Sequence, residues 1–220
     1  TLRHIRDCLN ARGMLGLRNS LLLSAGTALG GTVIAAFAAY AAARHRGSLA
    51  RSVHLLSTLT LSIPGLVLGL AYVLAFKRTA LYETMGILIF SSIIHFFTTP
   101  YLMLYQTFGK LNANLEGTGR VLGVPPFRLF ANVFLPQCAE TLLDMFSYFF
   151  LNAMVTISAV SFLATAQTRP LSMLVTQYSD QINPEGAAVL SFFILAINLL
   201  VRGIVFLLKH LLCTPARAAQ

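Results

Sequence analysis

Five long apolar stretches dominate the sequence and restrict the chain to one class of fold. A membrane-crossing α-helix needs about 20 mostly apolar residues. In hydrocarbon every backbone N–H and C=O must be satisfied inside the protein, and a helix does this within one segment. The sequence therefore predicts an all-α, polytopic transmembrane helical bundle of five spans. The expected spans are residues 20–43, 53–76, 86–108, 140–164 and 187–208.

Composition and charge agree with a membrane protein. Hydrophobic residues make up 56% of the 220 residues and charged residues only 10%, against about 25% charged in soluble domains. The net charge is +9, but the basic residues lie between the apolar stretches and not in one patch. This favours an orientation signal in a lipid bilayer, so no nucleic-acid partner is expected.

The basic residues also predict the orientation. Segments 44–52, 109–136 and the tail after residue 208 carry eight Lys and Arg, whereas the opposite loops carry three. The positive-inside rule therefore places segment 109–136 in the cytoplasm. The four arginines of residues 1–19 would then lie on the outer side of the membrane, which conflicts with the positive-inside rule. An upstream span, missing because the chain is truncated, would explain this conflict.

The sequence divides into three parts. Residues 1–19 form a basic flanking segment that can fold as an amphipathic surface helix. Residues 20–210 form the transmembrane domain, and residues 211–220 form a cytoplasmic tail. Within the first span, Gly26 and Gly30 lie four residues apart, which predicts close packing against another helix.

Segment 109–136 is a polar, basic insert punctuated by Gly and Pro. One short helix is predicted over 112–122 and a second over 127–135, with Val124-Pro125-Pro126 between them and Pro136 at the end. Such an insert must sit in water, and it predicts an exposed docking surface for a soluble partner. A surface or re-entrant loop without a partner is the alternative.

Polar residues near the middle of the spans indicate a transport path. Pro64 should break the second span, and His95 and Asn152 lie at a similar depth. Polar groups in lipid usually face the bundle interior or a water-filled cavity. Hydrogen bonding between helices, without any solute, is the alternative. Further candidates for the lining are Thr156 and Ser158, and then Thr60, Ser62, Ser91, Ser92 and Ser161.

Enzyme signatures are absent from the sequence. It contains no Gly-x4-Gly-Lys-Ser/Thr phosphate loop, no His-Glu-x-x-His and no Gly-x-Ser-x-Gly. The cysteines Cys8, Cys138 and Cys213 have no metal-binding spacing. Glu140 and Asp144 fit a helix start, where acids are favoured. We therefore expect no ATPase site, no catalytic residue, no metal and no cofactor.

The insert resembles a known family. Gly123 is followed thirteen residues later by Pro136, with Phe-Arg-x-Phe and Val-x-Leu-Pro between them. This resembles the cytoplasmic loop of permease subunits of type I binding-protein-dependent ABC importers. That loop begins Glu-Ala-Ala in the family, whereas this chain has Gly117-Thr118-Gly119, with Glu116 one position early.

Three further segments carry the resemblance across residues 17–210. Residues 17–21 (LRNSL) resemble the entry to the first core span, and residues 63–70 (IPGLVLGL) resemble the kinked span of the ferric-ion, thiamine and 2-aminoethylphosphonate branches. Residues 152–160 (NAMVTISAV) resemble the phosphonate and ferric-ion branches.

The resemblance implies a permease that moves a small solute, such as a phosphonate or ferric ion, across the bacterial inner membrane by alternating access. Its implied partners are a cytoplasmic ABC ATPase dimer, a second permease half, fused or separate, and a periplasmic or extracellular solute-binding protein. The insert would be the coupling helix in the ATPase groove. The residues implied for it are Glu116, Gly117, Gly119, Leu122, Gly123, Val124, Phe127, Phe130 and Pro136.

The role of Glu116 has two interpretations. It substitutes for the family glutamate with a one-residue shift of register, or the apolar side chains of the insert carry the coupling instead. Two other functions are weighed. An ion-coupled secondary transporter should have intramembrane acids at mid-depth, and a membrane-embedded transferase should have an interfacial cluster of His, Asp or Glu. The nearest such cluster is Cys138, Glu140 and Asp144.

Overall fold

A computed structural model describes residues 11–45, 47–181 and 183–217. All regular structure in these ranges is helical, without any strand, which confirms the all-α class. The helices are α2 (Ala11–Arg44), α3 (Ser48–Leu59), η1 (Thr60–Ser62), α4 (Gly65–Phe76), α5 (Met85–His95), α6 (Thr98–Lys110), α7 (Leu115–Val121), α8 (Pro126–Leu129), η2 (Phe130–Phe134), α9 (Leu135–Gln137), α10 (Ala139–Val155), α11 (Leu171–Asp180) and α12 (Pro184–Arg217).

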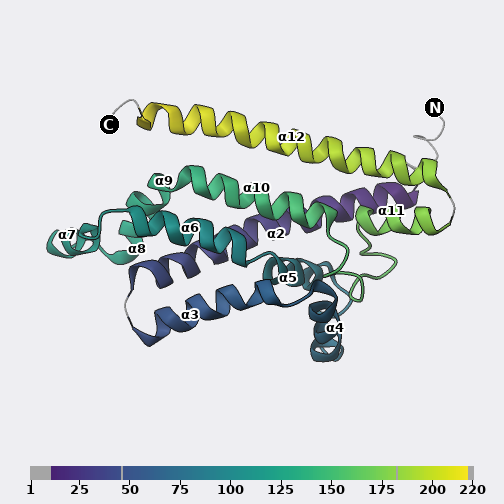
Figure 1. Cartoon of the computed structure of the whole chain (residues 1–220), viewed down its shortest axis with the longest axis horizontal. Helices are drawn as coiled ribbons and strands as arrows, with labels where there is room; N and C mark the ends of the chain where they lie inside the picture. The colour runs from purple at the N-terminus through teal and green to yellow at the C-terminus, as the bar shows by residue number, and fades with distance from the viewer. Residues whose placement is uncertain (1–10, 46, 182, 218–220) are drawn as a thin grey trace.

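The long helices share one direction (Figure 1). Helices α2, α3, α6, α10 and α12 run roughly along the long axis of the molecule, and α4 turns away from it. Helices α7 and α8 project from one end, where the α2–α3 turn and the C-terminal end of α12 also lie. The start of α2 and helix α11 lie at the other end. The three basic segments therefore gather at one end, as the charge pattern predicts.

The number of membrane spans is not confirmed as five. In the described residues, Arg12–Arg44 and Pro184–Leu211 are long and apolar enough to cross a membrane. Two bent pairs would raise the number to four: Ser48–Ser62 with Gly65–Phe76, bent by 112°, and Met85–His95 with Thr98–Lys110, bent by 53°. The remaining candidate, α10, has 17 residues.

The predicted fourth span is shorter than expected. Helix α10 ends at Val155, and Thr156 has extended backbone angles. The hydroxyl of Ser172 donates a hydrogen bond to the Thr156 carbonyl at 2.6 Å. This bond satisfies one of the carbonyls that a helix end leaves open. Residues 156–164 then form turns instead of the predicted last helical turns.

The two bent spans have a proline near each break. Ile63 has extended backbone angles, because proline disfavours helical angles in the residue before it. Pro64 follows and directly precedes Gly65, the first residue of α4. The break before Thr98 was not predicted. Pro100 lies in the first turn of α6, where its missing N–H removes no helical hydrogen bond.

Both flanking segments continue into long helices where the structure describes them. Residues 11–19 are the first turns of α2 and not a separate surface helix, whereas residues 1–10 lie outside the described part. Residues 211–217 extend α12, and residues 218–220 also lie outside the described part.

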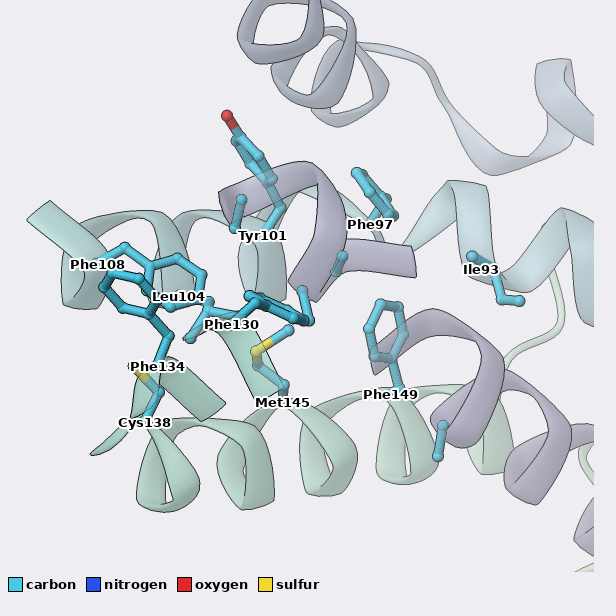
Figure 2. Packing of buried hydrophobic residues seen from close by; sticks show 14 of the residues in the cluster. Ile93, Phe97, Tyr101, Leu104, Phe108, Phe130, Phe134, Cys138, Met145 and Phe149 are labelled. Carbon is cyan, nitrogen blue, oxygen red and sulfur yellow. The ribbon is translucent and has the colours of Figure 1, made fainter. Parts of the chain in front are cut away.

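An aromatic core joins α2 to α6 and α10 (Figure 2). Small residues of α2 allow the close approach: an ideal Cβ at Gly26 would lie 2.6 Å from Ile89 Cδ1, and one at Gly31 would lie 2.8 Å from Phe149 Cζ. Gly30 similarly faces Ile93. The predicted role of Gly26 and Gly30 in helix packing is confirmed. The largest fully buried side chains of this core are Tyr101, Leu104, Phe108, Phe134, Met145 and Phe149.

We expect Gly31→Ala to lower the melting temperature of the purified protein, with a loss of about 1–3 kcal/mol from overpacking. The added methyl group meets the fully buried Phe149 ring, which has little room to move. Gly203→Ala in α12 is the control, because no atom would lie within 4 Å of its Cβ. Equal melting temperatures for both variants would contradict this account of the packing.

Candidate functional site

The insert folds as two short helical segments around a glycine turn. Gly123 has φ +68°, a left-handed conformation that favours glycine. The Val124 N–H donates to Gly119 O at 2.8 Å and the Gly123 N–H donates to Arg120 O at 3.1 Å. This is the Schellman pattern that closes a helix end. The predicted elbow between two short helices is therefore confirmed.

Two boundaries of the insert differ from the prediction. Helix α7 begins at Leu115 and not at 112, because Asn112 Oδ1 accepts a hydrogen bond from the Asn114 N–H at 2.9 Å and forms a turn there. Pro136 does not end the second segment, which stays helical to Gln137. The preceding residues, Phe130–Phe134, form a π-helix, a wider helical form often found at functional sites.

The outer part of the insert, residues 115–129, is called the knob below. Its apolar surface consists of Val121, Leu122 and Phe127, which are 88%, 72% and 71% exposed. The side chains of Arg120 and Arg128 are also exposed. An apolar patch with a basic rim is typical of a protein-docking surface. Val121, the last residue of α7, is not among the residues predicted from the sequence, although its place before the glycine turn could have indicated it.

Other predicted coupling residues lie inside the molecule. Phe130 is 4% exposed, and its ring stacks on Phe37 at 5.1 Å and lies 4.8 Å from the Tyr40 ring. Val124 is half-buried against the same core. Among the predicted large apolar residues of the insert, only Leu122 and Phe127 are exposed. Gly119 is buried against Leu129, whereas Gly117 and Pro136 are exposed.

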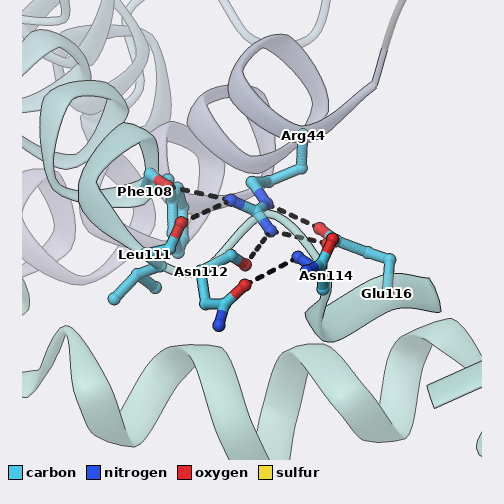
Figure 3. Close-up of polar contacts among 6 residues, drawn as sticks. All are labelled: Arg44, Phe108, Leu111, Asn112, Asn114 and Glu116. Carbon is cyan, nitrogen blue, oxygen red and sulfur yellow. Dashed lines mark hydrogen bonds and ion pairs between the residues drawn. The ribbon is translucent and has the colours of Figure 1, made fainter. Parts of the chain in front are cut away.

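Arg44, the last residue of α2, holds the knob in place (Figure 3). Its Nε and Nη2 donate to the two carboxylate oxygens of Glu116, both at 2.6 Å. A planar guanidinium fork on a carboxylate is one of the strongest side-chain pairs. The guanidinium also lies over the Phe134 ring, with Cζ 5.1 Å from the centroid.

The same guanidinium caps the end of α6. Arg44 Nη1 donates to Phe108 O and Leu111 O, both at 3.2 Å, and Nη2 donates to Asn112 O at 2.8 Å. These carbonyls lie at the C-terminal end of α6, where helical hydrogen bonding runs out. One side chain thus joins α2, α6 and the start of α7. The sequence alone predicts Arg44 only as part of the basic segment 44–52.

The pKa of Glu116 reflects this pairing. Partial burial acts to raise the pKa of the carboxyl, but the hydrogen bonds from Arg44 and from the backbone outweigh it, and the net pKa lies below its ordinary value. A carboxyl with a lowered pKa in the folded state contributes stability above its unfolded pKa and loses it as the pH falls through the folded pKa. The pair is therefore intact at neutral pH and weakens only in acid.

A second ion pair lies at the same end of the molecule. Lys209 Nζ lies 2.5 Å from Asp144 Oδ2 and 4.0 Å from Glu140 Oε1. These contacts join the C-terminal part of α12 to the first turns of α10. The two acids therefore hold a helix pair together, in addition to their favourable position at the start of α10.

Three of the predicted path features meet at one place. An ideal Cβ on Gly65, next to Pro64, would lie 2.5 Å from Ser158 Oγ and 2.9 Å from His95 Cε1. Among the described residues, the buried His95 Nδ1 has no hydrogen-bond partner. The break in the second span thus lies beside His95 and the turn that follows α10.

Three other path candidates, Asn152, Ser91 and Thr60, make side-chain hydrogen bonds within the protein. Asn152 Nδ2 donates to Tyr148 O of its own helix at 2.8 Å. Thr156 is buried, and its Oγ1 has no partner among the described residues. Ser91 donates to Ala159 O at 3.0 Å, and Thr60 lies 2.7 Å from the Thr98 hydroxyl. For Ser91 and Thr60 these bonds favour a role in packing.

We expect Glu116→Gln to loosen the knob. The side chain of Arg44 is 7% exposed, so the loss of its counter-charge leaves a nearly buried cation incompletely paired. Hydrogen–deuterium exchange of the α7 amides should speed up about tenfold, as expected for a loss of about 1.4 kcal/mol. Asp180→Asn is the control, because it removes an exposed carboxylate far from Arg44 along the chain. Unchanged exchange in α7 would show that the pair does not hold the knob.

Comparisons with known proteins agree with this geometry. The family model of the binding-protein-dependent transport system inner membrane component matches residues 20–212. The Fe(3+)-transport system permease protein FbpB 2 of Haemophilus influenzae is 28% identical over 194 residues, which cover 87% of this chain and 38% of that protein. A spermidine/putrescine transport system permease protein PotC homolog of Mycoplasma genitalium is 29% identical over 124 residues, covering 54% and 44%. The chain thus spans less than half the length of these relatives.

A solved structure shows the same fold. The crystal structure of a bacterial alginate ABC transporter, in complex with an alginate pentasaccharide-bound periplasmic protein, matches with a TM-score of 0.74. The match covers 91% of this chain and 79% of that chain, at 12% identity. The family match extends over most of the sequence and includes the knob, so the chain belongs to the family of binding-protein-dependent transport system inner membrane components.

Proposed function

We propose that this chain is the membrane-embedded permease part of an ATP-driven importer in the bacterial inner membrane. Family membership and the alginate transporter fold support this proposal. The solute would cross by alternating access, and the knob would transmit the movement of a cytoplasmic ATPase to the helices. The chain itself would carry no ATPase site. The relatives give no support to an ion-coupled secondary transporter or a membrane-embedded transferase.

The geometry of the knob is the observation that carries the proposal. Three exposed apolar side chains stand at the end where the basic loops gather, on a scaffold tied to α2 through Arg44 and Glu116. A rigid, exposed apolar anchor suits insertion into a groove of a partner. The proposed partners are an ATPase dimer on this side and, elsewhere, a second permease half and a solute-binding protein.

The solute is proposed from the names of relatives. Ferric ion has the strongest support, because a relative named for Fe(3+) transport covers most of the chain, and a polyamine is the second candidate. Phosphonate and thiamine remain predictions from the sequence resemblance alone. The meeting of the Pro64 break with His95 and Ser158 is the proposed constriction of the path.

We expect Leu122→Asp in the full-length permease to abolish ATP-dependent uptake. The charge would enter the apolar centre of the proposed contact, and loss of such an anchor costs about 2 kcal/mol or more. Co-purification of the ATPase should fall about 30-fold. Leu81→Asp is the control, because Leu81 is also an exposed leucine but lies in the turn between α4 and α5. Normal uptake and ATPase association in Leu122→Asp would overturn the proposed coupling.

We expect Gly123→Val to uncouple ATP hydrolysis from uptake while the permease still inserts in the membrane. A left-handed conformation costs a residue with a Cβ about 1–2 kcal/mol, and no atom lies within 4 Å, so the effect is confined to the backbone. Gly117→Val is the control, because Gly117 lies within α7 and also faces open space. Uptake per ATP hydrolysed should fall only in Gly123→Val; equal ratios would argue against the elbow.

A further inference from the structure

A cavity lined by basic and aromatic side chains lies between the end of α2, the first turns of α3 and helix α6. The α2–α3 turn lies at the end of the molecule from which the knob projects (Figure 1). The volume of the cavity is about 400 Å³, within the range of roughly 300–1,000 Å³ of small-molecule sites. The polar side chains of its lining are His45, Arg51, His54 and Tyr105, and none of the described lining residues is acidic. The cavity therefore favours an anion over a cation.

The charge of Arg51 is not neutralised within the described part of the chain. Its side chain is exposed, and its guanidinium has no hydrogen bond or ion pair among the described residues. An acid whose charge reaches the cavity lining, at His45, is Glu116, but both oxygens of that carboxylate already accept hydrogen bonds from Arg44. The N–H donors of Arg51 are thus open to an oxyanion, whose oxygens a guanidinium can bind in pairs.

The rings beside Arg51 are held in place by α6. His54 Nδ1 lies 2.8 Å from the hydroxyl of Tyr101, a fully buried residue. The His54 ring also packs on Tyr105, with the ring centroids 4.7 Å apart. When the Tyr101 hydroxyl donates to Nδ1, the neutral imidazole carries its proton on Nε2 and can donate it to a ligand. Donors fixed before a ligand arrives lower the entropic cost of binding.

Apolar surface continues from Arg51 along α3. Leu55 and Leu59 follow Arg51 at intervals of four residues, so the three side chains share one face of the helix. Leu55 is 61% exposed and Leu59 is 55% exposed. Helix α3 also begins the bent pair of helices that is long enough to cross a membrane. A cation at the end of a span, with apolar side chains next to it, matches a phospholipid, whose phosphate adjoins its acyl chains.

We propose that this cavity binds the phosphate of an anionic phospholipid, with an acyl chain along Leu55 and Leu59. Arg51 would bind the phosphate oxygens through charge-assisted hydrogen bonds, and His54 and Tyr105 would donate to the headgroup. A soluble phosphate would meet the same donors but would leave the apolar face of α3 unused. The proposed function places the cavity in the cytoplasmic leaflet, and only that placement rests on the proposed function.

Native mass spectrometry of the full-length permease tests the site. The protein is purified in an uncharged detergent and titrated with phosphatidylglycerol or phosphatidylcholine. The wild type should bind phosphatidylglycerol saturably and more tightly than phosphatidylcholine. Arg51→Gln should weaken phosphatidylglycerol binding about tenfold or more, because a charge-assisted hydrogen bond is lost. Tyr105→Phe, which keeps the ring against His54, should weaken it about threefold.

Arg78→Gln is the matched control. Arg78 is also an exposed arginine at the end of a bent helix pair, and Leu74, four residues before it, is 76% exposed, but Arg78 does not line this cavity. This variant should bind phosphatidylglycerol like the wild type. Equal weakening by Arg51→Gln and Arg78→Gln would indicate a general attraction of the lipid to basic protein and would overturn the proposal. Unchanged binding in Arg51→Gln would overturn it as well, and if Arg51→Gln fails to fold, Tyr105→Phe decides.

Competition with soluble phosphates distinguishes the two sources of the anion. Glycerophosphoglycerol carries the phosphodiester of phosphatidylglycerol without its acyl chains, and sodium phosphate carries the phosphate alone. Weak competition by both identifies the lipid as the ligand. Competition by either one at the concentration at which the lipid itself binds identifies a soluble phosphate and overturns the lipid proposal. The titration needs neither an ATPase nor transport, so a failure of the proposed function would leave its result unchanged.

Discussion

The guanidinium of Arg44, the last residue of α2, binds carbonyls at the C-terminal end of α6 and the carboxylate of Glu116. Phe108 O and Asn112 O also accept backbone hydrogen bonds, from the N–H groups of Leu111 and Leu115, so Arg44 adds to the bonds that hold this turn. With them, the knob forms one body with α2. A force on the knob would therefore reach the core helices directly, through the guanidinium and the aromatic rings beneath it.

The aromatic rings complete this connection. Phe130 and Phe134 come from the insert, but they lie in the same core as Tyr40 of α2 and Phe108 of α6. Only the outer residues of the knob remain exposed. One face of the insert, with Phe130 and Phe134, thus packs in the core, and the other face, with Val121, Leu122 and Phe127, is exposed.

The opposite end of the molecule is built from irregular segments. The turn after α10 brings Ser158 beside Gly65 and His95, and the turn before α11 is held by Asn19 and Ser20. Backbone without regular structure is tolerated in a membrane protein only when it is buried in protein or lines a water-filled cavity. These two turns meet that condition through side-chain hydrogen bonds from neighbouring helices. Serine and asparagine side chains in the spans therefore hold these turns by hydrogen bonds, whether or not they also line a transport path.

Local rules predicted the features that depend on neighbours in the sequence. The length of the apolar stretches predicted the helical class. Pro64 predicted the break in the second span, and Gly123 predicted the turn between the two short helices of the insert. The same rules did not predict the break before Thr98. Pro100 lies in the first turn of α6, where a proline is compatible with the helix and does not by itself mark a break. They also extended the fourth span beyond Val155, since its apolar pattern continues through residues that turn.

The sequence by itself determined the helical membrane class, the position of the insert and the glycine that bends it, because chain entropy, proline geometry and the cost of polar backbone in lipid act locally. Only the tertiary structure decided that Arg44 pairs with Glu116 and that Phe130 is buried while Val121 is exposed. Arg44 and Glu116 are 72 residues apart along the chain. Their contact depends on how the helices pack, which no local pattern contains.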